Sequence, residues 1–406
     1  MVQVVEGSLS TRRRILFVDD EQHVLDGLQN LLRKQRREWD MSFALGGASA
    51  LAAFAEAPFD IVVADMRMPG MDGAQLLSEI RDAYPATARI VLSGHAERES
   101  VTRALAVAHQ FLTKPCDPDL LRRVVARVCG LQSLLFDPRM RELIGRIDRL
   151  PSVPQVYVEL IDALVNESGT TAQIAAIIER DPAMTAKVLQ LVNSSYFGLA
   201  RRVSSISEAV GYLGSDLLRS LALTAQVFVQ VQTTTPAGVS LERLQEQALL
   251  GSRLARALLS TDLARANDAF TSALVRDLGS MVLALGIPAD YGRVVAAAGA
   301  EPLHVTETRE LGVSHAEVGA YLLGVWGLPP TIVEAVAHHH EPATVDHDDR
   351  AVLDAVHVAA EVADAVIEGR APRIVAALKD RLDGPHGWAA LIARELERLD
   401  LGSVEL

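Results

Sequence analysis

Cysteine is nearly absent from this chain, which has only Cys116 and Cys129 in 406 residues. Their spacing fits neither a metal knuckle nor a redox pair, so we expect two free thiols in a reducing compartment. Aromatic residues are also scarce, at 4%, which favours helices packed through aliphatic side chains. No apolar run reaches the roughly 18 residues of a membrane span, and the N-terminus lacks the apolar core of a signal peptide. We therefore expect a cytoplasmic protein with no membrane partner.

Positive charge is in deficit as well. The chain has 39 lysines and arginines against 52 aspartates and glutamates, which gives a net charge of −13. This balance argues against a broad nucleic-acid surface, and no helix-turn-helix pattern is evident. Hydrophobic residues reach 49% and charged residues 22%, values typical of globular proteins. A chain of this length is expected to form about two or three domains.

The apolar runs divide the chain into two parts. Up to about residue 130, five short apolar runs alternate with amphipathic segments, which predicts a doubly wound parallel sheet with helices on both faces. The predicted strands lie near residues 14–18, 41–45, 60–64, 89–93 and 110–112. The predicted helices lie near residues 22–36, 47–56, 73–83, 97–107 and 118–129.

After Leu131 the sequence shows no strand signal, and we expect only helices. The fold class is therefore a multidomain protein, with a five-stranded α/β domain followed by an all-α domain. The predicted boundaries are 12–130 for the α/β domain, 131–150 for a helical linker and 151–400 for the all-α domain, with lobes at 151–235 and 240–400.

Reactive side chains stand where several of the predicted strands end. They are Asp19, Asp20, Asp65, Ser93 and Lys114. In an open parallel sheet the carboxyl ends of the strands share one edge, where ligands bind, so we expect these groups to meet in one pocket. Three carboxylates and a lysine without other partners would be costly to bury together. A divalent cation and a phosphoryl group would resolve that conflict.

These residues resemble the receiver domain of two-component response regulators. The acidic pair Asp19-Asp20 follows the first strand, and Asp65 ends the third. A typical receiver turn, Met66–Gly73, comes next. Ser93 and Lys114-Pro115 stand at the ends of the last two strands. Five such motifs in this order make the resemblance specific.

The resemblance implies that Asp65 accepts a phosphoryl group from a cognate histidine kinase with the help of Mg²⁺. Asp20, Asp65 and the backbone carbonyl of Arg67 would hold the ion, and Asp19 would act through water. A carboxylate is a competent nucleophile, and Mg²⁺ neutralises charge on the transferred oxygens. The alternative is a degenerate receiver whose acid cluster is structural.

The resemblance also assigns roles to the remaining pocket residues. Lys114 would pair with Asp65 at rest and with the phosphoryl oxygens after transfer. Ser93 would donate its hydroxyl to the phosphoryl group, and Phe111 stands at the aromatic switch position. The Lys114-Pro115 bond is expected to be cis, as it is in the family.

A second resemblance covers about residues 150–365. Its motifs are Leu150–Tyr157, Ile177–Met184, Lys187–Gly198 and Ile206–Gly214. They resemble the HDOD domain, an all-α output module related to the HD phosphohydrolases. Asp181-Pro182 predicts a capped helix start, and Asn193 a helix end, so we expect packing roles for these residues.

HD enzymes hold their metals with a histidine, a His-Asp pair and further histidines. The matching positions here are Gln247, Arg276, Asp277, His315, His339 and His340. A guanidinium is permanently charged and cannot bind a cation, and without the upstream ligands the shell is incomplete. We therefore expect no metal and no catalysis in the helical domain. His315 and His339 are interpreted as hydrogen-bonded residues beside a vestigial cleft.

Together these patterns favour a response regulator in which phosphorylation of Asp65 changes how the receiver packs on the helical domain, or drives formation of a homodimer. The helical domain would then bind an unknown downstream signalling protein, and the 131–150 linker would be the two-state element. Two alternatives make the helical half a cyclic-dinucleotide phosphodiesterase or a nucleotide-binding sensor. In the sensor, Arg276 beside Asp277 would meet a phosphate.

Overall fold

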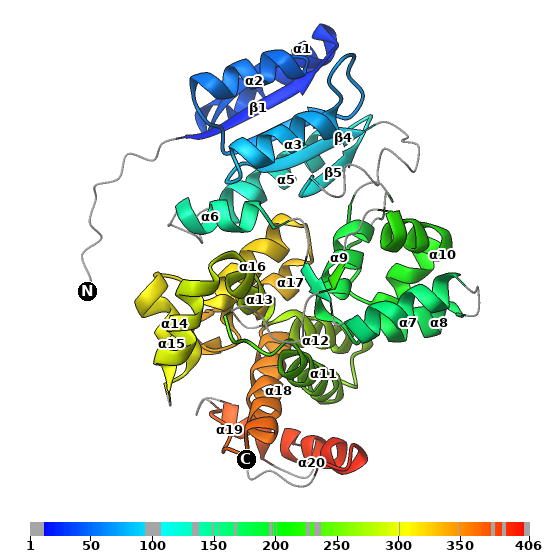
Figure 1. The fold of residues 1–406 in the computed structure, drawn as a ribbon, viewed down its shortest axis with the longest axis vertical. Helices are drawn as coiled ribbons and strands as arrows, with labels where there is room; N and C mark the ends of the chain where they lie inside the picture. The colour runs from blue at the N-terminus through cyan, green and yellow to red at the C-terminus, as the bar shows by residue number, and fades with distance from the viewer. Residues whose placement is uncertain are drawn as a thin grey trace.

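The chain folds into a small α/β domain and a larger helical domain (Figure 1). The computed structural model describes residues 12–93, 107–131, 138–147, 150–152, 154–165, 169–194, 197, 199, 201–224, 228–230, 237–299, 301–347, 349–374, 378–383 and 387–401. The predicted fold class is confirmed.

Five parallel strands form the sheet of the α/β domain, in the order β2-β1-β3-β4-β5. They are β1 (Arg13–Asp19), β2 (Trp39–Leu45), β3 (Ile61–Asp65), β4 (Ala88–Ser93) and β5 (Gln110–Thr113). Strand β3 is buried along its whole length, which explains why it reads as an unbroken apolar run. All five predicted strands are present.

The helices of this domain are α1 (Gln22–Leu31), α2 (Gly47–Glu56), α3 (Gly73–Ala83) and α5 (Pro118–Leu131). The first is shorter than predicted, because the chain tightens into the 3₁₀ helix η1 (Arg33–Arg37). That segment is basic and buries none of its residues, so it lacks the apolar face that would hold an α-helix against the sheet. The helix predicted at 97–107 lies almost wholly outside the described residues.

The expectation of helices alone after Leu131 is wrong. Two short strands, β6 (Leu150–Ser152) and β7 (Phe228–Gln230), form a parallel pair. Three-residue strands are too short to show alternation, and Pro151 restricts Leu150 to extended backbone without giving a strand pattern. The described part of the linker contains a helix only at α6 (Pro138–Gly145), shorter than the 131–150 prediction.

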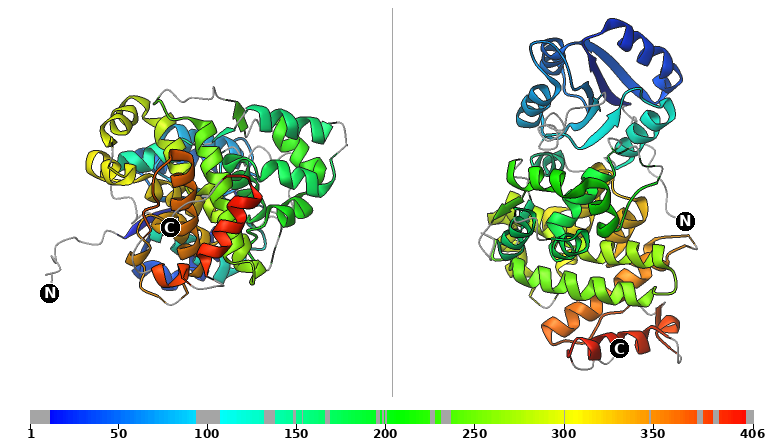
Figure 2. Two further views of the ribbon diagram at one scale, coloured as in Figure 1. Left: turned by 90° about the horizontal axis from the view of Figure 1, so that it is seen from below. Right: turned by 90° about the vertical axis from the view of Figure 1, so that its right-hand side faces the viewer.

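The helical domain begins with a group that lies to one side in Figures 1 and 2. It comprises α7 (Pro154–Val165), α8 (Thr171–Ile178), α9 (Pro182–Val192) and α10 (Ile206–Thr224). As predicted, Asp181 caps α9 by accepting a hydrogen bond from the Met184 amide, and Pro182 fills the first turn. Asn193 ends the same helix. Its side-chain amide donates to the Val203 carbonyl oxygen and accepts from the Val203 amide.

Among the remaining helices, the long helices α11 and α18 pack against each other. The remaining helices are α11 (Leu241–Leu258), α12 (Leu263–Val275), α13 (Leu278–Gly286), α14 (Pro288–Ala298), α15 (Leu303–Leu311), α16 (His315–Val325), α17 (Pro330–His338), η3 (Pro342–Thr344), α18 (Ala351–Glu368), α19 (Lys379–Leu382) and α20 (Trp388–Arg398). Within the described chain, one helical stretch, Leu263–Gly286, is long and apolar enough to be weighed as a membrane span. Because 83% of its apolar window is buried inside the domain, it is weak evidence for a membrane.

The α/β domain rests on the helical domain along β5 and α5, and Figures 1 and 2 show the two domains in contact. Gln110 of β5 donates its amide to the carbonyl oxygen of Val325 at 2.8 Å. Gln190 of α9 donates to the carbonyl oxygen of His109 at 3.3 Å. Helix α5 also packs on α16.

Charged groups are buried at the same contact. The Lys187 ammonium lies 4.0 Å from the ring centre of Trp326. The Arg89 guanidinium donates to the carbonyl oxygen of Gly145 in α6 at 2.9 Å and lies 2.9 Å from Nε2 of His109. We refer to Arg89, His109, Gln110, Gly145, Lys187, Gln190, Val325 and Trp326 as the domain interface.

Candidate functional site

The carboxyl edge of the α/β sheet carries a pocket of two buried acids and a lysine. Asp19, at the end of β1, is 1% exposed and Asp65, at the end of β3, is 6% exposed. Lys114 directly follows β5, and its ammonium lies 2.6 Å from Oδ2 of Asp19 and forms a second ion pair with Oδ1 of Asp65. The predicted Asp65–Lys114 pair is therefore present, with Asp19 as an additional partner.

Backbone groups hold the two acids in place. The amide of Arg67 donates to Oδ2 of Asp65 at 2.8 Å, and the amide of Glu21 donates to Oδ1 of Asp19 at 3.0 Å. Gly73 opens α3 directly behind the pocket, where a Cβ atom would lie 2.3 Å from the Asp65 carbonyl oxygen. A glycine is therefore required there for the turn to close on the strand.

Burial sets the electrostatics of this pocket. It raises the pKa of Asp65, and this effect outweighs the lowering by Lys114 and by the Arg67 amide. For Lys114, burial alone would lower the pKa, but its hydrogen bonds to Asp19 and Asp65 outweigh that cost and raise it. The pocket thus holds one ammonium between two carboxyl groups, an arrangement suited to receive a doubly negative group in place of one carboxylate.

The other predicted pocket residues are placed as follows. Asp20 follows β1 and is half-buried, and Phe111 is buried in β5. Ser93 ends β4 in register with Thr113, while its side chain lies outside what the structure describes. The Lys114–Pro115 peptide bond is cis, as the resemblance implied. Carboxylate and carbonyl oxygens are the donors that Mg²⁺ prefers, so the residues present fit this ion.

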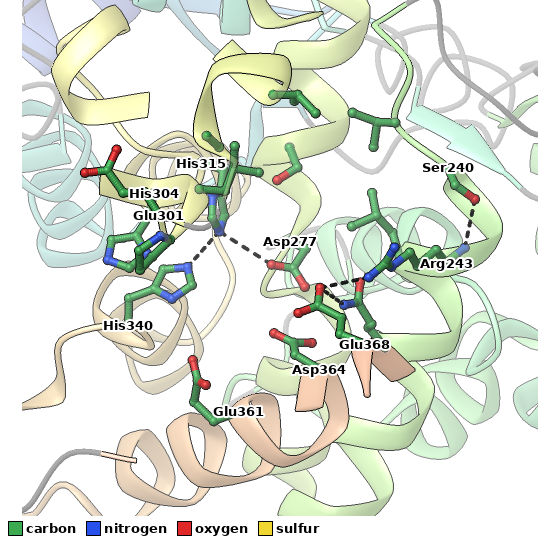
Figure 3. Close-up of a pocket in the computed structure, with 18 of the residues that line it drawn as sticks. Ser240, Arg243, Asp277, Glu301, His304, His315, His340, Glu361, Asp364 and Glu368 are labelled. Atoms are coloured by element: carbon green, nitrogen blue, oxygen red, sulfur yellow. Dashed lines mark hydrogen bonds and ion pairs between the residues drawn. The ribbon is translucent and has the colours of Figure 1, made fainter. Parts of the chain in front are cut away.

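A second cluster lies in the helical domain, around a cavity of about 780 Å³ (Figure 3). Gln247, Asp277, His315 and His340 line it. Gln247 lies in α11 and His315 in α16, while Asp277 directly precedes α13 and His340 follows α17. Gly279 lets α13 approach α16, because a Cβ there would lie 1.9 Å from the His315 carbonyl oxygen. The sequence-predicted HD positions are therefore brought together.

Arg276 lies behind the cavity with its side chain 1% exposed. Its Nε is 2.9 Å from Oδ2 of Asp277, and a terminal nitrogen is 2.6 Å from Oδ1 of Asp364. Asp364 was missed from the sequence. The signal available was the spacing of Glu361, Asp364 and Glu368, which places three acids on one face of α18.

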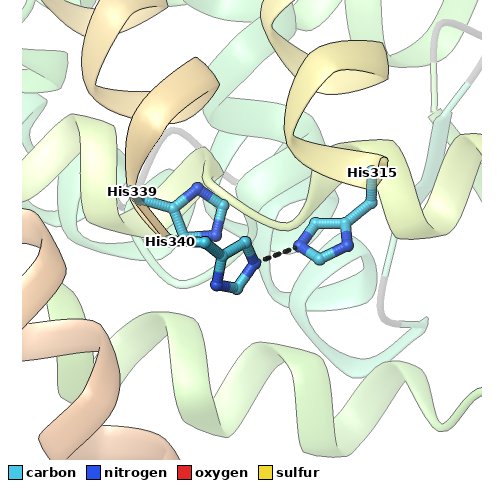
Figure 4. A group of neighbouring side chains, drawn as sticks. All are labelled: His315, His339 and His340. Carbon is cyan, nitrogen blue, oxygen red and sulfur yellow. Dashed lines mark hydrogen bonds between the residues drawn. The ribbon is translucent and has the colours of Figure 1, made fainter. Parts of the chain in front are cut away.

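The histidines form a compact group beside Asp277 (Figure 4). Nε2 of His315 lies 2.9 Å from Nε2 of His340 and 3.5 Å from Oδ1 of Asp277. His339 lies 3.9 Å from the same oxygen through Nε2 and contacts the Val336 carbonyl oxygen at 2.8 Å through Nδ1. The possible ligand atoms are thus close enough together to surround one metal ion, although the sequence predicted no metal here.

Burial and one hidden acid set the protonation of these rings. Burial lowers the pKa of His339 to about 3 and that of His340 well below its usual range. Burial also opposes charge on His315, but Glu307, whose Oε2 is 2.6 Å from its Nδ1, outweighs it and raises the pKa. Glu307 is fully buried and accepts a 2.6 Å hydrogen bond from Tyr291. Sequence reasoning missed Glu307 because its helix carries no HD signature.

Comparisons with known proteins agree with both halves of this description. The family model for the response regulator receiver domain matches residues 15–126. The family model for the HDOD domain matches residues 150–342. The chain therefore carries a response regulator receiver domain. An HDOD domain follows it in the helical part of the chain.

Curated relatives match parts of the chain. An uncharacterized protein of Treponema pallidum is 29% identical over 228 residues, which cover 55% of this chain and 44% of the relative. The regulatory protein AtoC of Escherichia coli is 38% identical over 122 residues, which cover 30% of this chain and 26% of AtoC. The chain therefore spans less than half the length of these curated relatives.

Among solved structures, the MmoQ response regulator of Methylococcus capsulatus matches with a TM-score of 0.50 and 22% identity. The match covers 63% of this chain and 99% of MmoQ. At this identity the likeness shows a shared fold.

Proposed function

We propose that Asp65 accepts a phosphoryl group from a histidine kinase and that this changes the domain interface. The HDOD domain then binds or releases a downstream signalling protein without catalysing a reaction. The observation that carries the proposal is the ion-paired Asp19–Lys114–Asp65 cluster, in which Lys114 directly follows β5, the strand that contacts the helical domain. The two free cysteines are in keeping with action in the cytoplasm.

The transfer itself is a displacement at phosphorus. A carboxylate oxygen of Asp65 forms a bond to phosphorus while the bond to the kinase histidine breaks, and the electron pair returns to the imidazole nitrogen. Lys114, already paired with Asp65, then binds the phosphoryl oxygens. A Mg²⁺ ion held by Asp20, Asp65 and the carbonyl of Arg67, with Asp19 through water, would neutralise charge on the transferred oxygens.

The route to the helical domain is short. Lys114 directly follows β5, and Gln110 of that strand contacts the Val325 carbonyl oxygen. A phosphoryl group adds roughly −1.5 to −2 charge beside Lys114 and so changes the balance of forces on the end of this strand. Helix α6, which contacts both Arg89 and α13, is positioned to change its packing at the same time. This supports the linker as the two-state element.

The non-catalytic role rests on Arg276. Hydrolytic HD-type sites need metal ligands with an open position. Here the Arg276 guanidinium is fixed between Asp277 and Asp364 by two short ion pairs. Both carboxylates therefore already have a cationic partner, which supports binding over hydrolysis.

Phosphoryl uptake tests the proposal. We expect acetyl phosphate to label the wild-type protein and beryllofluoride to bind it, with both lost in Asp65→Asn and retained in the surface control Asp82→Asn. Hydrogen exchange should rise at α5 and α16 when the wild type binds beryllofluoride. Equal labelling of Asp65→Asn would remove Asp65 from its role, and unchanged exchange at the domain interface would remove the coupling.

A nucleotide sensor is the second candidate, because Arg243, Arg370 and Arg373 line the cavity. Arg243 and Arg370 are paired with Glu368, however, and acids outnumber arginines along the wall. Calorimetry with cyclic dinucleotides separates this candidate from the first, and a hydrolysis assay with metal analysis addresses a phosphodiesterase. A flat titration and no turnover would leave protein binding as the function.

A further inference from the structure

We propose that Asp277, His315, His339 and His340 bind one transition-metal ion, with Zn²⁺ the best fit, in a closed site that takes no part in hydrolysis. We call these four residues the histidine site. The inference stands apart from the phosphorylation proposal, because it rests on a different cluster in a different domain.

The separations of the ligand atoms fit one ion. Tetrahedral zinc with bonds of 2.0–2.2 Å places neighbouring ligand atoms about 3.3 Å apart. In the histidine site, His315 Nε2 lies 2.9 Å from His340 Nε2 and 3.5 Å from Asp277 Oδ1. His339 Nε2 lies 3.9 Å from the same oxygen, and the three histidines offer ligand atoms that all lie within 4.8 Å of one another. Changes of a few tenths of an ångström would complete the shell.

Hydrogen bonds outside the site already orient two of the rings for metal binding. His315 Nδ1 contacts the Glu307 carboxylate at 2.6 Å, and His339 Nδ1 contacts the Val336 carbonyl oxygen at 2.8 Å. An acceptor at Nδ1 places the proton there and leaves the lone pair on Nε2, which faces the centre of the site. Carboxylates and carbonyls in this position are what metal-bound histidines use to fix their tautomer.

A buried nitrogen atom of the histidine site lacks a hydrogen-bond partner. Nε2 of His339 has no hydrogen-bond partner among the described residues, although its side chain is 1% exposed. Buried polar atoms are nearly always satisfied, so an atom left open and aimed at two other imidazoles points to a missing ligand. A metal ion satisfies it, and it also separates the His315 and His340 nitrogens, which otherwise face each other.

Arg276 does not block the ion. Its guanidinium binds Oδ2 of Asp277 and Oδ1 of Asp364, whereas Oδ1 of Asp277 faces the histidines. The Asp277 and Glu307 carboxylates outnumber this one guanidinium, so a dication improves the local charge balance. Three imidazoles and one carboxylate fill a tetrahedral shell, which leaves no open position for a reacting water.

Metal titration of the full chain tests the site. Chelator-treated protein should bind one Zn²⁺ per chain with a rise in melting temperature. Co²⁺ in its place should give the strong visible absorption of tetrahedral coordination, which oxygen sites such as the receiver pocket lack. We expect His339→Ala and His340→Gln to weaken binding by at least about 100-fold, since each removes a direct ligand. The matched control His338→Ala, whose Nδ1 lies near Thr344, should bind as the wild type does.

The outcomes separate cleanly when the titration is run in the Asp65→Asn background, which disables the receiver pocket. If Co²⁺ added to a protein with an intact histidine site gives no tetrahedral absorption, the proposal is overturned. Equal Zn²⁺ affinity of His338→Ala and His340→Gln would also overturn it. If His339→Ala fails to fold, the half-buried His340→Gln still decides the question. Binding unaffected by any of the histidine variants would mark the metal as adventitious and end the proposal.

Discussion

Burying Arg276 with its two carboxyl partners costs a large desolvation free energy, because each ion loses its contacts with water. The guanidinium of Arg276 binds Asp277 and Asp364 through two different nitrogens, so a side chain with one cationic atom could not replace it. The arginine is thus a packing residue and a counter-ion at once, a role that a lysine, with its single ammonium, cannot fill in the same geometry.

Replacing Arg276 with methionine should therefore destabilise the protein strongly. The change keeps much of the side-chain volume but leaves Asp277 and Asp364 without their cation, so we expect the free energy of unfolding to fall by about 3–5 kcal/mol. Denaturant unfolding measures it. The control is Arg293→Met, which breaks an exposed pair with Asp290 and should cost at most about 1 kcal/mol. Similar losses in both variants would contradict the counter-ion role.

His109 makes the domain interface sensitive to acid. Burial, with Arg89 and Lys187 nearby, holds its pKa well below its usual range, so it stays neutral in the folded protein. The unfolded chain takes up a proton below pH 6.5, so stability is complete above that value and falls as the pH drops below it. Between pH 7.5 and 5.5 we expect a loss of about 1.4 kcal/mol from this residue.

Thermal unfolding across this pH range gives the measurement. His109→Asn keeps an acceptor near the Nδ1 position, which accepts from the Arg89 amide, but it cannot titrate. Its stability should lose this pH-dependent component. A variant with the same slope as the wild type would place the acid sensitivity elsewhere.

Part of the candidate site could be predicted from the sequence, residue by residue. Asp19, Asp65 and Lys114 were predictable because each ends a strand at the same sheet edge, as the ion pairs show. Glu307 was not, because helical residues meet through tertiary packing that periodicity does not encode. The spacing of Asp364 with Glu361 and Glu368 marks an acidic face of α18, but it does not show that this face meets Arg276. The direction in which Arg276 points was equally hidden, and it decides whether Asp277 is free to face the histidines.

Among the secondary-structure elements, helix α6 packs tightly against the receiver domain. A Cβ atom on Gly145 would lie 1.7 Å from the Pro85 carbonyl oxygen, and Arg89 donates to the carbonyl oxygen of Gly145 itself. The helix therefore transmits any movement of the loop that carries Pro85, because backbone meets backbone with no flexible side chain between them.

Gly145→Ala should push α6 off the receiver. We expect a loss of about 1–3 kcal/mol from the clash and faster hydrogen exchange in α6. Gly27→Ala is the matched control, because Gly27 lies in α1 with open space around its Cβ position. That change should stabilise its helix by about 0.5–1 kcal/mol. Unchanged exchange in α6 of Gly145→Ala would show that the contact is loose.

The elements themselves divide by how locally they are determined. The five long strands and helices α2 and α3 follow from apolar runs and turn residues in sequence, and these were predicted within a few residues. The β6–β7 pair joins Leu150 to Phe228, a contact between distant segments that no local pattern marks. The same holds for the domain interface, whose members come from five separate elements.

For the whole molecule, the domain interface covers the β5 and α5 side of the receiver. A homodimer formed through that surface would require the helical domain to move away first. If phosphorylation loosens the interface, a dimer and a larger radius of gyration should appear together.

Scattering and light-scattering chromatography with beryllofluoride measure both quantities. We expect a rise in radius of gyration in the wild type and none in Asp65→Asn. Gly145→Ala should shift the same way without beryllofluoride, because it weakens the interface directly. A dimer that forms while the scattering of each protomer stays the same would show that another surface is used.

The β6–β7 pair also decides how the protein can be dissected. It joins the two ends of the segment between Leu150 and Gln230 by strand pairing, so an excised helical domain must include both strands. A fragment that begins after Ser152 would lack β6 and leave the main-chain amides and carbonyls of β7 unpaired along one edge, which favours aggregation. Starting upstream at Pro138 retains the strand pair together with α6, and gives the more promising starting material for isolating whatever the helical domain recognises.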